Sequence, residues 1–383
     1  MRLGLIYHQF VDTGGLEKYL LGLSRTLVDC GHQLDVVTAK TDAITRAEPG
    51  IRLHMLKRPP LSSMLRLWDF AWRSESFCRN DEGFRSSVDL TIGFGRTISQ
   101  DLHRAGGGCH AVYSCLLPSS KRLGLKNRLE LSLERQLYTS EKTRHFVVNA
   151  SKVRDELQAT YGIDPAKCSV IHTAVNTAQF FPAESESQRQ SLRHELGMPA
   201  DRKIALFVSS SHRRKGLGPI LNALSSSASL SDLDIWIAGK ALDARHRQMA
   251  QTIPGLLPRL KFLGDRSDLA ALYRACDLFV HPTLYDACAN TVLQAMSSGT
   301  PSIVSAADGA AEFIDHGRNG FVLQNPTDSK ELRHHLEVAS SLGAGSRAQI
   351  AEAARNRMLP LTWHTHVAKW EELFEKLKPS TPA

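Results

Sequence analysis

The sequence predicts an α/β protein with two doubly wound domains, each a parallel sheet with helices on both faces. Short apolar runs typical of buried strands alternate with longer helical stretches along most of the chain. This alternation stops at a polar segment, residues 176–201, which Pro182 and Pro199 interrupt, and then it starts again. The length of 383 residues also fits about two domains.

Residues 1–175 are expected to form the N-terminal domain. Its expected strands are Leu3–Tyr7, Leu34–Thr38, Ile51–Leu56, Leu90–Gly93 and His145–Val148. Its helical candidates are Gly15–Asp29, Asn127–Tyr138 and Lys152–Tyr161. Helices between successive strands are the crossovers that a parallel sheet needs.

Residues 176–360 are expected to form the C-terminal domain, with a hinge and a helix around Arg189–Glu195 in its opening polar segment. The expected strands are Ile204–Ser209, Ile235–Ala238, Leu260–Leu263, Leu278–His281 and Ser302–Ser305. The expected helices are Leu217–Leu224, Leu269–Ala275 and Asn290–Ser298. The same strand–helix rhythm therefore predicts a second parallel sheet.

Residues 361–383 form a separate tail, in which Trp363–Leu377 has apolar residues at spacings of three and four. We expect an amphipathic helix that closes the molecule by packing back across the domains. A membrane-surface helix is the alternative, which the acidic residues Glu371, Glu372 and Glu375 disfavour.

Composition excludes several classes of protein. Hydrophobic residues make up 42% of the chain and charged residues 22%, which is typical of globular proteins. No apolar run approaches the roughly 18 residues of a membrane span, and the first apolar run is too short for a signal peptide. The seven cysteines form no C-x-x-C pair, so we expect a reduced, cytoplasmic protein. The net charge of +8 fits a phosphate-bearing ligand, an anionic membrane or nucleic acid, without choosing among them.

A glycine pair, Gly14–Gly15, lies between the first expected strand and the first expected helix. Glycines here let a ligand approach the backbone, and the helix N-terminus attracts a phosphate. The alternative is a tight turn without a ligand. The loop lacks G-x-G-x-x-G, so a dinucleotide fingerprint is not supported.

A basic turn, Arg213–Lys215 followed by Gly216, comes after the expected strand at 204–209. Ligands of open α/β sheets bind at the carboxyl ends of the strands, where Arg and Lys can hold phosphate oxygens. The alternative is an ordinary solvated run of charges.

The segment His281–Pro301 is the most informative part of the sequence. It resembles the nucleotide-sugar site of family-four retaining glycosyltransferases, which have the two-domain GT-B fold. In that family an acidic residue follows a strand and a second one comes eight positions later, before Ala-Met; here these positions hold Asp286 and Gln294. Further motifs match along nearly the whole chain: Gly14–Gly15, Arg214–Gly216, Ile171–Asn176, Glu312 and Gly317–Gly320. Within the family, the resemblance is greatest to lipopolysaccharide core glucosyltransferases.

The resemblance implies two Rossmann-like domains that face a cleft, and it assigns roles to individual residues. Asp286 and His110 would be the catalytic residues, which orient the donor sugar and contact its other side. The donor phosphates would be bound by a set of five residues: Gly15, Arg214, Lys215, Ala289 and Asn290. Gln294 would bind the ribose. No cofactor and no metal ion are expected.

The resemblance also implies the reaction, which is transfer of a sugar from a nucleoside-diphosphate sugar, UDP-linked, with retention. The acceptor would be a glycan or a lipid-linked molecule, as in synthesis of the lipopolysaccharide core or another cell-envelope glycan. Two alternatives stay open: a nucleotide-sugar epimerase of the same fold, and a non-catalytic relative that binds nucleotide sugars. A nucleic-acid partner is not expected, because the basic charge is diffuse.

Three features of the sequence have competing interpretations. The family's two glutamates are replaced by Asp286 and Gln294, and Asp286 could alternatively be a helix-start residue. His110 follows three glycines and could be a structural loop residue. The pair Asp232 and Asp234 has the spacing of a metal-binding D-x-D, but it leads into a strand, at the end opposite the expected ligand site.

The stretch Lys121–Arg135 combines basic residues with leucines at helical spacings. Such a helix can contact anionic lipid, which would place the protein at the inner face of the cytoplasmic membrane. The alternative is a helix with a solvated basic face.

Overall fold

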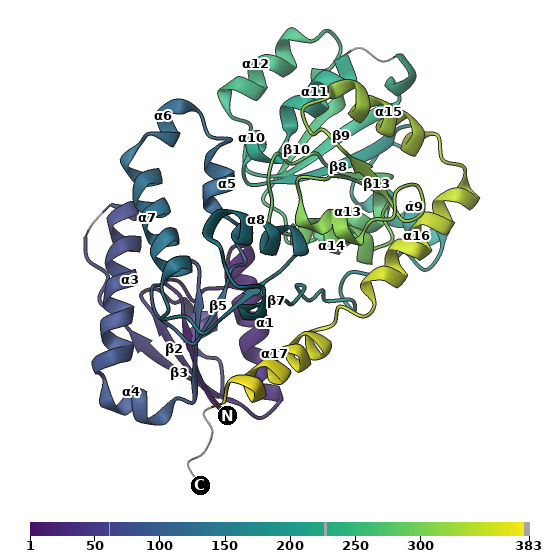
Figure 1. Ribbon diagram of the computed structural model, residues 1–383. Coiled ribbons are helices and arrows are strands. Elements are labelled where there is room, and N and C mark those ends of the chain that lie inside the picture. Colours follow the sequence, from purple (N-terminus) through teal and green to yellow (C-terminus); the bar gives the residue numbers. More distant parts are fainter. Residues whose placement is uncertain (61, 226–227, 379–383) are drawn as a thin grey trace. The chain divides into compact units, whose positions relative to one another are not determined.

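The structure is a computed structural model that describes residues 1–60, 62–225 and 228–378 (Figure 1). The chain divides into two compact units. Unit 1 contains residues 1–174 together with the C-terminal segment from Trp363, and unit 2 contains residues 175–362.

Unit 1 is built on a parallel sheet of seven strands in the order β3-β2-β1-β4-β5-β6-β7. The strands are β1 (Arg2–Ile6), β2 (Gln33–Thr38), β3 (Ile51–Met55), β4 (Leu90–Phe94), β5 (Leu102–Arg104), β6 (His145–Val148) and β7 (Cys168–Val170). The central strand β1 is buried from Leu3 to Ile6, as expected for a parallel strand that is covered on both faces.

The helices of unit 1 lie between these strands, apart from the last one. They are α1 (Gly15–Asp29), α2 (Ala43–Arg46), α3 (Ser63–Asn80), α4 (Glu82–Ser87), α5 (His110–Ser114), α6 (Ser119–Arg122), α7 (Leu125–Thr139), α8 (Ser151–Tyr161) and α17 (Trp363–Leu377). A short 3₁₀ turn, Pro165–Lys167, precedes β7.

The C-terminal helix α17 belongs to the core of unit 1, where it lies beside α1 (Figure 1). Trp370 is fully buried in the same apolar cluster as Leu20 and Leu23 of α1. Its indole nitrogen donates to Nε2 of His366 at 3.1 Å, and the Tyr19 hydroxyl lies 2.7 Å from the same nitrogen. The amphipathic pattern of the sequence therefore reflects burial against α1.

Unit 2 is built on a parallel sheet of six strands in the order β10-β9-β8-β11-β12-β13. The strands are β8 (Lys203–Ser209), β9 (Leu233–Gly239), β10 (Leu260–Gly264), β11 (Leu278–His281), β12 (Ser302–Ser305) and β13 (Phe321–Leu323). The helices are α9 (Glu186–Glu195), α10 (His212–Lys215), α11 (Leu217–Ser225), α12 (Ala244–Thr252), α13 (Leu269–Ala275), α14 (Asn290–Ser297), α15 (Ser329–Ser340) and α16 (Ala344–Met358). Short 3₁₀ turns span Ala228–Leu230, Leu257–Arg259 and Gly309–Phe313.

The two parallel sheets confirm the predicted fold class. The predicted strands and helices agree with the structure to within two residues at each end, except that α9 begins at Glu186, three residues before the predicted Arg189. Among the helices of nine or more residues, the sequence patterns did not indicate α3, α12, α15 and α16, and they did not indicate the edge strands β7 and β13. Both of these strands have only three residues, which is too short to show a period.

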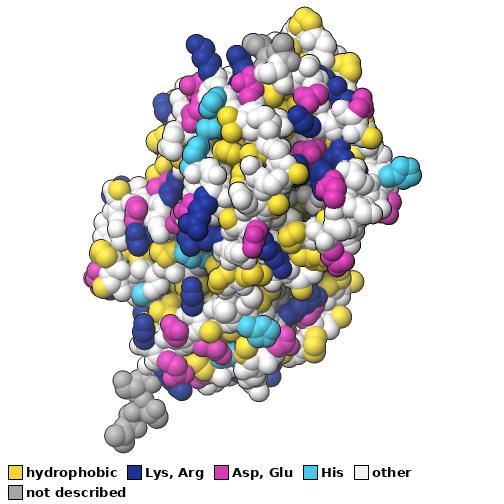
Figure 2. Space-filling model, turned by 90° about the vertical axis from the view of Figure 1, so that its right-hand side faces the viewer, with side chains coloured by type: hydrophobic (Ala, Val, Ile, Leu, Met, Phe, Trp, Pro, Cys, Tyr) yellow, Lys and Arg dark blue, Asp and Glu magenta, His cyan; other side chains and the backbone are white. Residues whose placement is uncertain are grey.

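The surface carries charges of both signs. On the face drawn in Figure 2, Lys and Arg side chains are interspersed with Asp and Glu side chains, with no broad field of one sign. None of the described helices is long and apolar enough to cross a membrane.

Candidate functional site

The basic turn of unit 2 is the helix α10, which directly follows β8. It ends at Gly216, whose φ of 87° is the left-handed conformation that favours glycine. A Cβ at this position would lie 2.0 Å from the carbonyl oxygen of Pro282. The turn can therefore pack closely against the loop that follows β11.

Backbone hydrogen bonds fix this packing. The carbonyl oxygen of Arg214 accepts from the amide of Leu284 at 2.8 Å and from the hydroxyl of Thr283 at 3.0 Å. Because β8 and β11 are parallel neighbours in the sheet, both segments leave it at the same edge. The result is that the cations of α10 lie beside Asp286.

Asp286 binds both cations through one oxygen. Lys215 donates from Nζ to Oδ2 of Asp286, and Nη1 of Arg214 lies 3.1 Å from the same oxygen. Arg214 also donates to the carbonyl oxygen of Tyr285 at 3.1 Å. Lys215 is buried, whereas the Arg214 side chain is 28% exposed and can still reach a ligand.

The electrostatic environment keeps Asp286 ionised. Burial alone would raise the pKa of Asp286, but the Lys215 ammonium, the His281 imidazole and the Arg214 guanidinium outweigh that effect. Together they hold the pKa well below its ordinary value.

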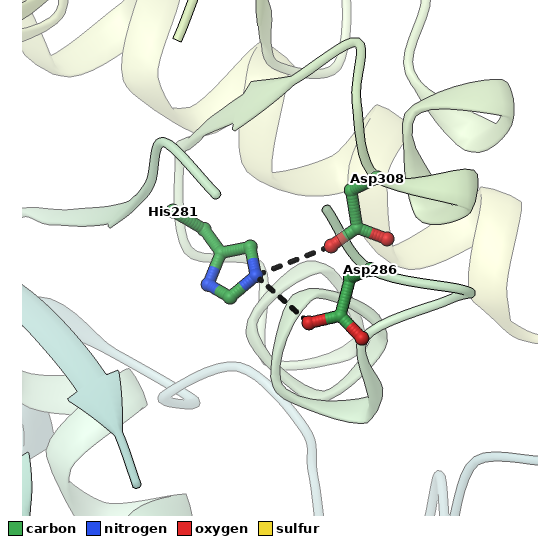
Figure 3. A group of neighbouring side chains, drawn as sticks. All are labelled: His281, Asp286 and Asp308. Carbon is green, nitrogen blue, oxygen red and sulfur yellow. Dashed lines mark ion pairs between the residues drawn. The ribbon is translucent and has the colours of Figure 1, made fainter. Parts of the chain in front are cut away.

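Two buried residues that the sequence analysis missed complete this group, His281 and Asp308 (Figure 3). The imidazole of His281 points toward both carboxylates, with Nε2 3.2 Å from Oδ2 of Asp308 and 3.8 Å from Oδ2 of Asp286. The other oxygen of Asp308 accepts from the amides of Ala289 at 3.1 Å and Ala310 at 2.8 Å. We call Arg214, Lys215, His281, Asp286 and Asp308 the strand-end cluster.

His281, Asp286 and Asp308 could in principle ligate a metal ion, because one donor atom of each lies within 4.8 Å of the others. A protein cation already contacts this group. The Lys215 ammonium donates to Asp286 and lies 3.5 Å from Nε2 of His281. A divalent ion bound here would have to compete with that ammonium for the Asp286 carboxylate.

The predicted residues Ala289, Asn290 and Gln294 all lie at or in α14. Ala289 is the N-cap residue, Asn290 begins the helix, and Gln294 is half-buried. Asp286 lies three residues before this N-cap, so the alternative that it caps the helix is wrong. Unit 2 thus brings together Asp286, Arg214 and Lys215 near the beginning of α14.

The predicted residues of unit 1 occupy a helix start and a buried position. Gly15 is the first residue of α1, after Gly14 with a φ of 102°. No atom lies within 4 Å of a Cβ built on Gly15, whereas a Cβ on Gly14 would lie 2.3 Å from the carboxylate of Glu17. The helix start is therefore open at Gly15, while the Glu17 side chain folds back over Gly14.

His110 is the first residue of α5 and is buried. Its Nε2 lies 2.8 Å from Oδ1 of Asn127 and 3.3 Å from Oε2 of Glu130. Its backbone amide donates to Glu134 at 2.7 Å. The histidine is thus held by α7 through both its ring and its backbone.

The D-x-D pair forms local ion pairs at the start of β9. Asp234 pairs with Arg202, and Asp232 pairs with Lys203 at 3.0 Å. Asp234 is also paired across the sheet with Ile204, near the amino end of β8. This edge of the sheet is opposite the strand-end cluster, in agreement with the expectation from the sequence.

Comparison with known proteins identifies both halves of the chain. The family model "Glycosyltransferase Family 4" matches residues 13–179, and the model "Glycosyl transferases group 1" matches residues 202–340. The lipopolysaccharide glucosyltransferase WaaG of Escherichia coli is 22% identical over 336 residues, which cover 87% of each chain.

Solved structures share the fold. A crystal structure of WaaG covers 97% of this chain and 99% of its own, with a TM-score of 0.83 at 20% identity. The Anabaena protein HepE, in complex with UDP and glucose, covers 98% of this chain and all of its own, with a TM-score of 0.74 at 20% identity.

The ion pairs of Asp286 predict a pH-dependent contribution to stability. The pKa of this carboxyl is lower in the folded chain than its ordinary value of about 3.9 in an unfolded one. Its stabilising effect is therefore fully present above about pH 4 and is lost as the pH falls below that value. We expect Asp286→Asn to lower the free energy of unfolding more at pH 6 than at pH 3.

Urea unfolding of the wild type and of Asp286→Asn at several pH values measures how much the substitution lowers the free energy of unfolding. This loss should shrink by up to about 1.4 kcal/mol for each pH unit below pH 4. Asp265→Asn, which removes an exposed carboxylate of the same unit, is the control. An Asp286→Asn effect of equal size at pH 6 and pH 3 would contradict the prediction.

Proposed function

The chain belongs to the glycosyltransferases of the GT-B fold. We propose that it transfers a sugar from a UDP-sugar to a glycan or lipid-linked acceptor with retention. The observation that carries the proposal is the pair Arg214 and Lys215, held by Asp286 at the carboxyl ends of β8 and β11. This is where ligands of open α/β sheets bind. The neighbouring structure of HepE with UDP and glucose supports a uridine donor.

Breaking the glycosidic bond places growing negative charge on the departing diphosphate. Arg214 and Lys215 would stabilise that charge, since fixed cations in a partly buried site need little reorganisation during the reaction. The amide of Asn290 at the start of α14 would add a hydrogen bond, whereas the amide of Ala289 already donates to Asp308. Asp286 would both position the cations and accept a hydrogen bond from a hydroxyl of the donor sugar.

The remaining roles follow the resemblance. In this proposal Gly15 contacts the donor phosphate, His110 contacts the transferred sugar, and Gln294 accepts from the ribose. Attack from the face that the diphosphate leaves gives retention without a protein nucleophile. The two cations take the place of a divalent metal, so transfer needs none.

Lys215→Ala tests the site. Loss of one charge-assisted phosphate contact is expected to raise the activation barrier by about 2–4 kcal/mol, which lowers kcat/KM with the UDP-sugar by roughly 30- to 1,000-fold. Arg213→Ala, which removes an exposed cation from the same turn, is the matched control. Activity of the wild type should persist in excess EDTA.

The same measurements separate the alternatives. UDP, GDP and ADP are first compared by thermal shift, where UDP should stabilise the chain selectively. Conversion of a UDP-sugar without release of UDP would identify an epimerase. Binding without turnover with any acceptor would identify a non-catalytic relative. Complete loss of transfer in EDTA, restored by Mg²⁺, would contradict metal independence.

Gln294 is tested by substitution in two directions. Gln294→Leu should weaken UDP binding, because the ribose hydroxyls lose their acceptor. Gln294→Glu should bind UDP within about tenfold of the wild type, because a carboxylate accepts at least as well as an amide and Arg214 and Lys215 offset its charge. Calorimetric titration with UDP measures both, and equal affinity of wild type and Gln294→Leu would exclude the ribose role.

A peripheral membrane contact on the cytoplasmic side is also proposed, through α6 and the beginning of α7. Leu123 is 73% exposed and Leu125 is 62% exposed, beside the exposed cations Lys121, Arg122 and Lys126. We expect co-sedimentation with phosphatidylglycerol vesicles that weakens with salt, because each cation near an anionic surface contributes about 1 kcal/mol. Leu123→Ser should reduce it, and equal binding to phosphatidylcholine vesicles would contradict the electrostatic part.

A further inference from the structure

Unit 1 contains a cavity at the carboxyl ends of β1, β2 and β3. The loops that follow these strands supply His8–Gln9, Ala39–Lys40 and Leu56–Pro59. Helices α3 and α7 close the cavity, whose volume is about 190 Å³. Its place at the strand ends is the usual position of a ligand site in an open α/β sheet.

The cavity is lined by more cations than anions. The cations are Lys40, Lys57, Arg58, Arg66, Arg73 and Lys126, and the anions are Asp69 and Glu130. Each anion neutralises one of the cations, because Arg73 lies 2.7 Å from Asp69 and Lys126 lies 3.9 Å from Glu130. Four cations therefore remain in excess.

These four cations, Lys40, Lys57, Arg58 and Arg66, form no ion pair with any residue that the structure describes. They come from two strand-end loops and from α3, so that they surround the cavity from different elements. Like charges that line one cavity repel each other, and an anion bound among them removes that cost.

The rest of the lining is apolar or neutral. Phe70 is buried, and the indole of Trp68 is 44% exposed at the cavity. Burial, with the charge of Arg58 as a second cause, lowers the pKa of His8 to about 4, so its ring is neutral at pH 7. An aromatic surface beside cationic groups suits a ring that carries an anionic substituent.

We propose that this cavity binds a phosphate-bearing sugar of the acceptor. The inference rests on the proposed function, since it names the chemistry of the acceptor in the same reaction. The volume is below the roughly 300–1,000 Å³ of sites that enclose a whole drug-sized ligand, so the cavity holds one ring with its phosphate while the rest of the acceptor lies outside. Arg58 and Arg66 can each donate two parallel hydrogen bonds to phosphate oxygens.

Glucose 6-phosphate is the probe, titrated by calorimetry into the full chain with saturating UDP present. UDP occupies the donor site, so that the sugar phosphate cannot bind at Arg214 and Lys215. We expect glucose 6-phosphate to bind, inorganic phosphate to bind more weakly, and glucose to give no signal. Binding should weaken as salt rises.

The variant Lys57→Gln/Arg58→Gln should weaken glucose 6-phosphate binding at least tenfold, because it removes two charge-assisted contacts. Both side chains are exposed, so the fold should tolerate the change. Lys167→Gln removes an exposed cation of the same unit away from the cavity and should bind as the wild type does. Affinity for UDP should be equal in all three proteins.

Equal affinity of glucose 6-phosphate for the wild type and the double variant would overturn the inference. Binding of glucose as tight as that of glucose 6-phosphate would overturn it as well. If the double variant loses binding to phosphatidylglycerol vesicles while the wild type does not bind glucose 6-phosphate, the cations serve a lipid surface and the inference fails. Failure of UDP to bind contradicts the proposed function instead.

Discussion

The ion pairs between Asp286 and the two cations of α10 determine how the segments at the carboxyl ends of β8 and β11 are arranged in unit 2. Lys215 is 8% exposed, and a buried ammonium without a partner is strongly destabilising. The loop after β11 must therefore deliver a carboxylate to that position. It can do so because β8 and β11 are neighbours, and because Gly216 lets α10 approach Pro282 more closely than a side chain would allow.

Part of this arrangement was predicted from the sequence. The family resemblance assigned Arg214, Lys215 and Asp286 to one donor site, and a parallel sheet does send the carboxyl ends of its strands in the same direction. The ion pairs among the three residues were not predicted. His281 and Asp308 could not be recognised in this way. His281 ends a buried strand, where a polar residue gives no periodic signal, and its contact with Asp308 depends on the pairing of β11 with β12. The one indication in the sequence was the position of His281 at the end of a strand, where ligands of such sheets bind.

The cavity of unit 1 was missed for a different physical reason. Its cations come from separate loops and from α3, and each one alone has the pattern of a solvated surface charge. Lys40 and Lys57 are brought together only by the sheet order β3-β2-β1, which places the carboxyl ends of β2 and β3 side by side. The two units thus hold cations in two ways. In unit 2 the half-buried carboxylate of Asp286 pairs with Arg214 and Lys215, whereas in unit 1 four cations have no acidic partner among the described residues.

The family's second acidic residue is replaced by Gln294, which lies in α14, and the amide of Ala289 at the start of this helix donates to Asp308 of the strand-end cluster. An amide at position 294 keeps an oxygen that can accept from ribose, at the cost of a weaker hydrogen bond than a carboxylate makes. It also adds no negative charge for Arg214 and Lys215 to offset beside a diphosphate. Asp286, whose charge is needed to hold the cations, is the position at which the acid is retained.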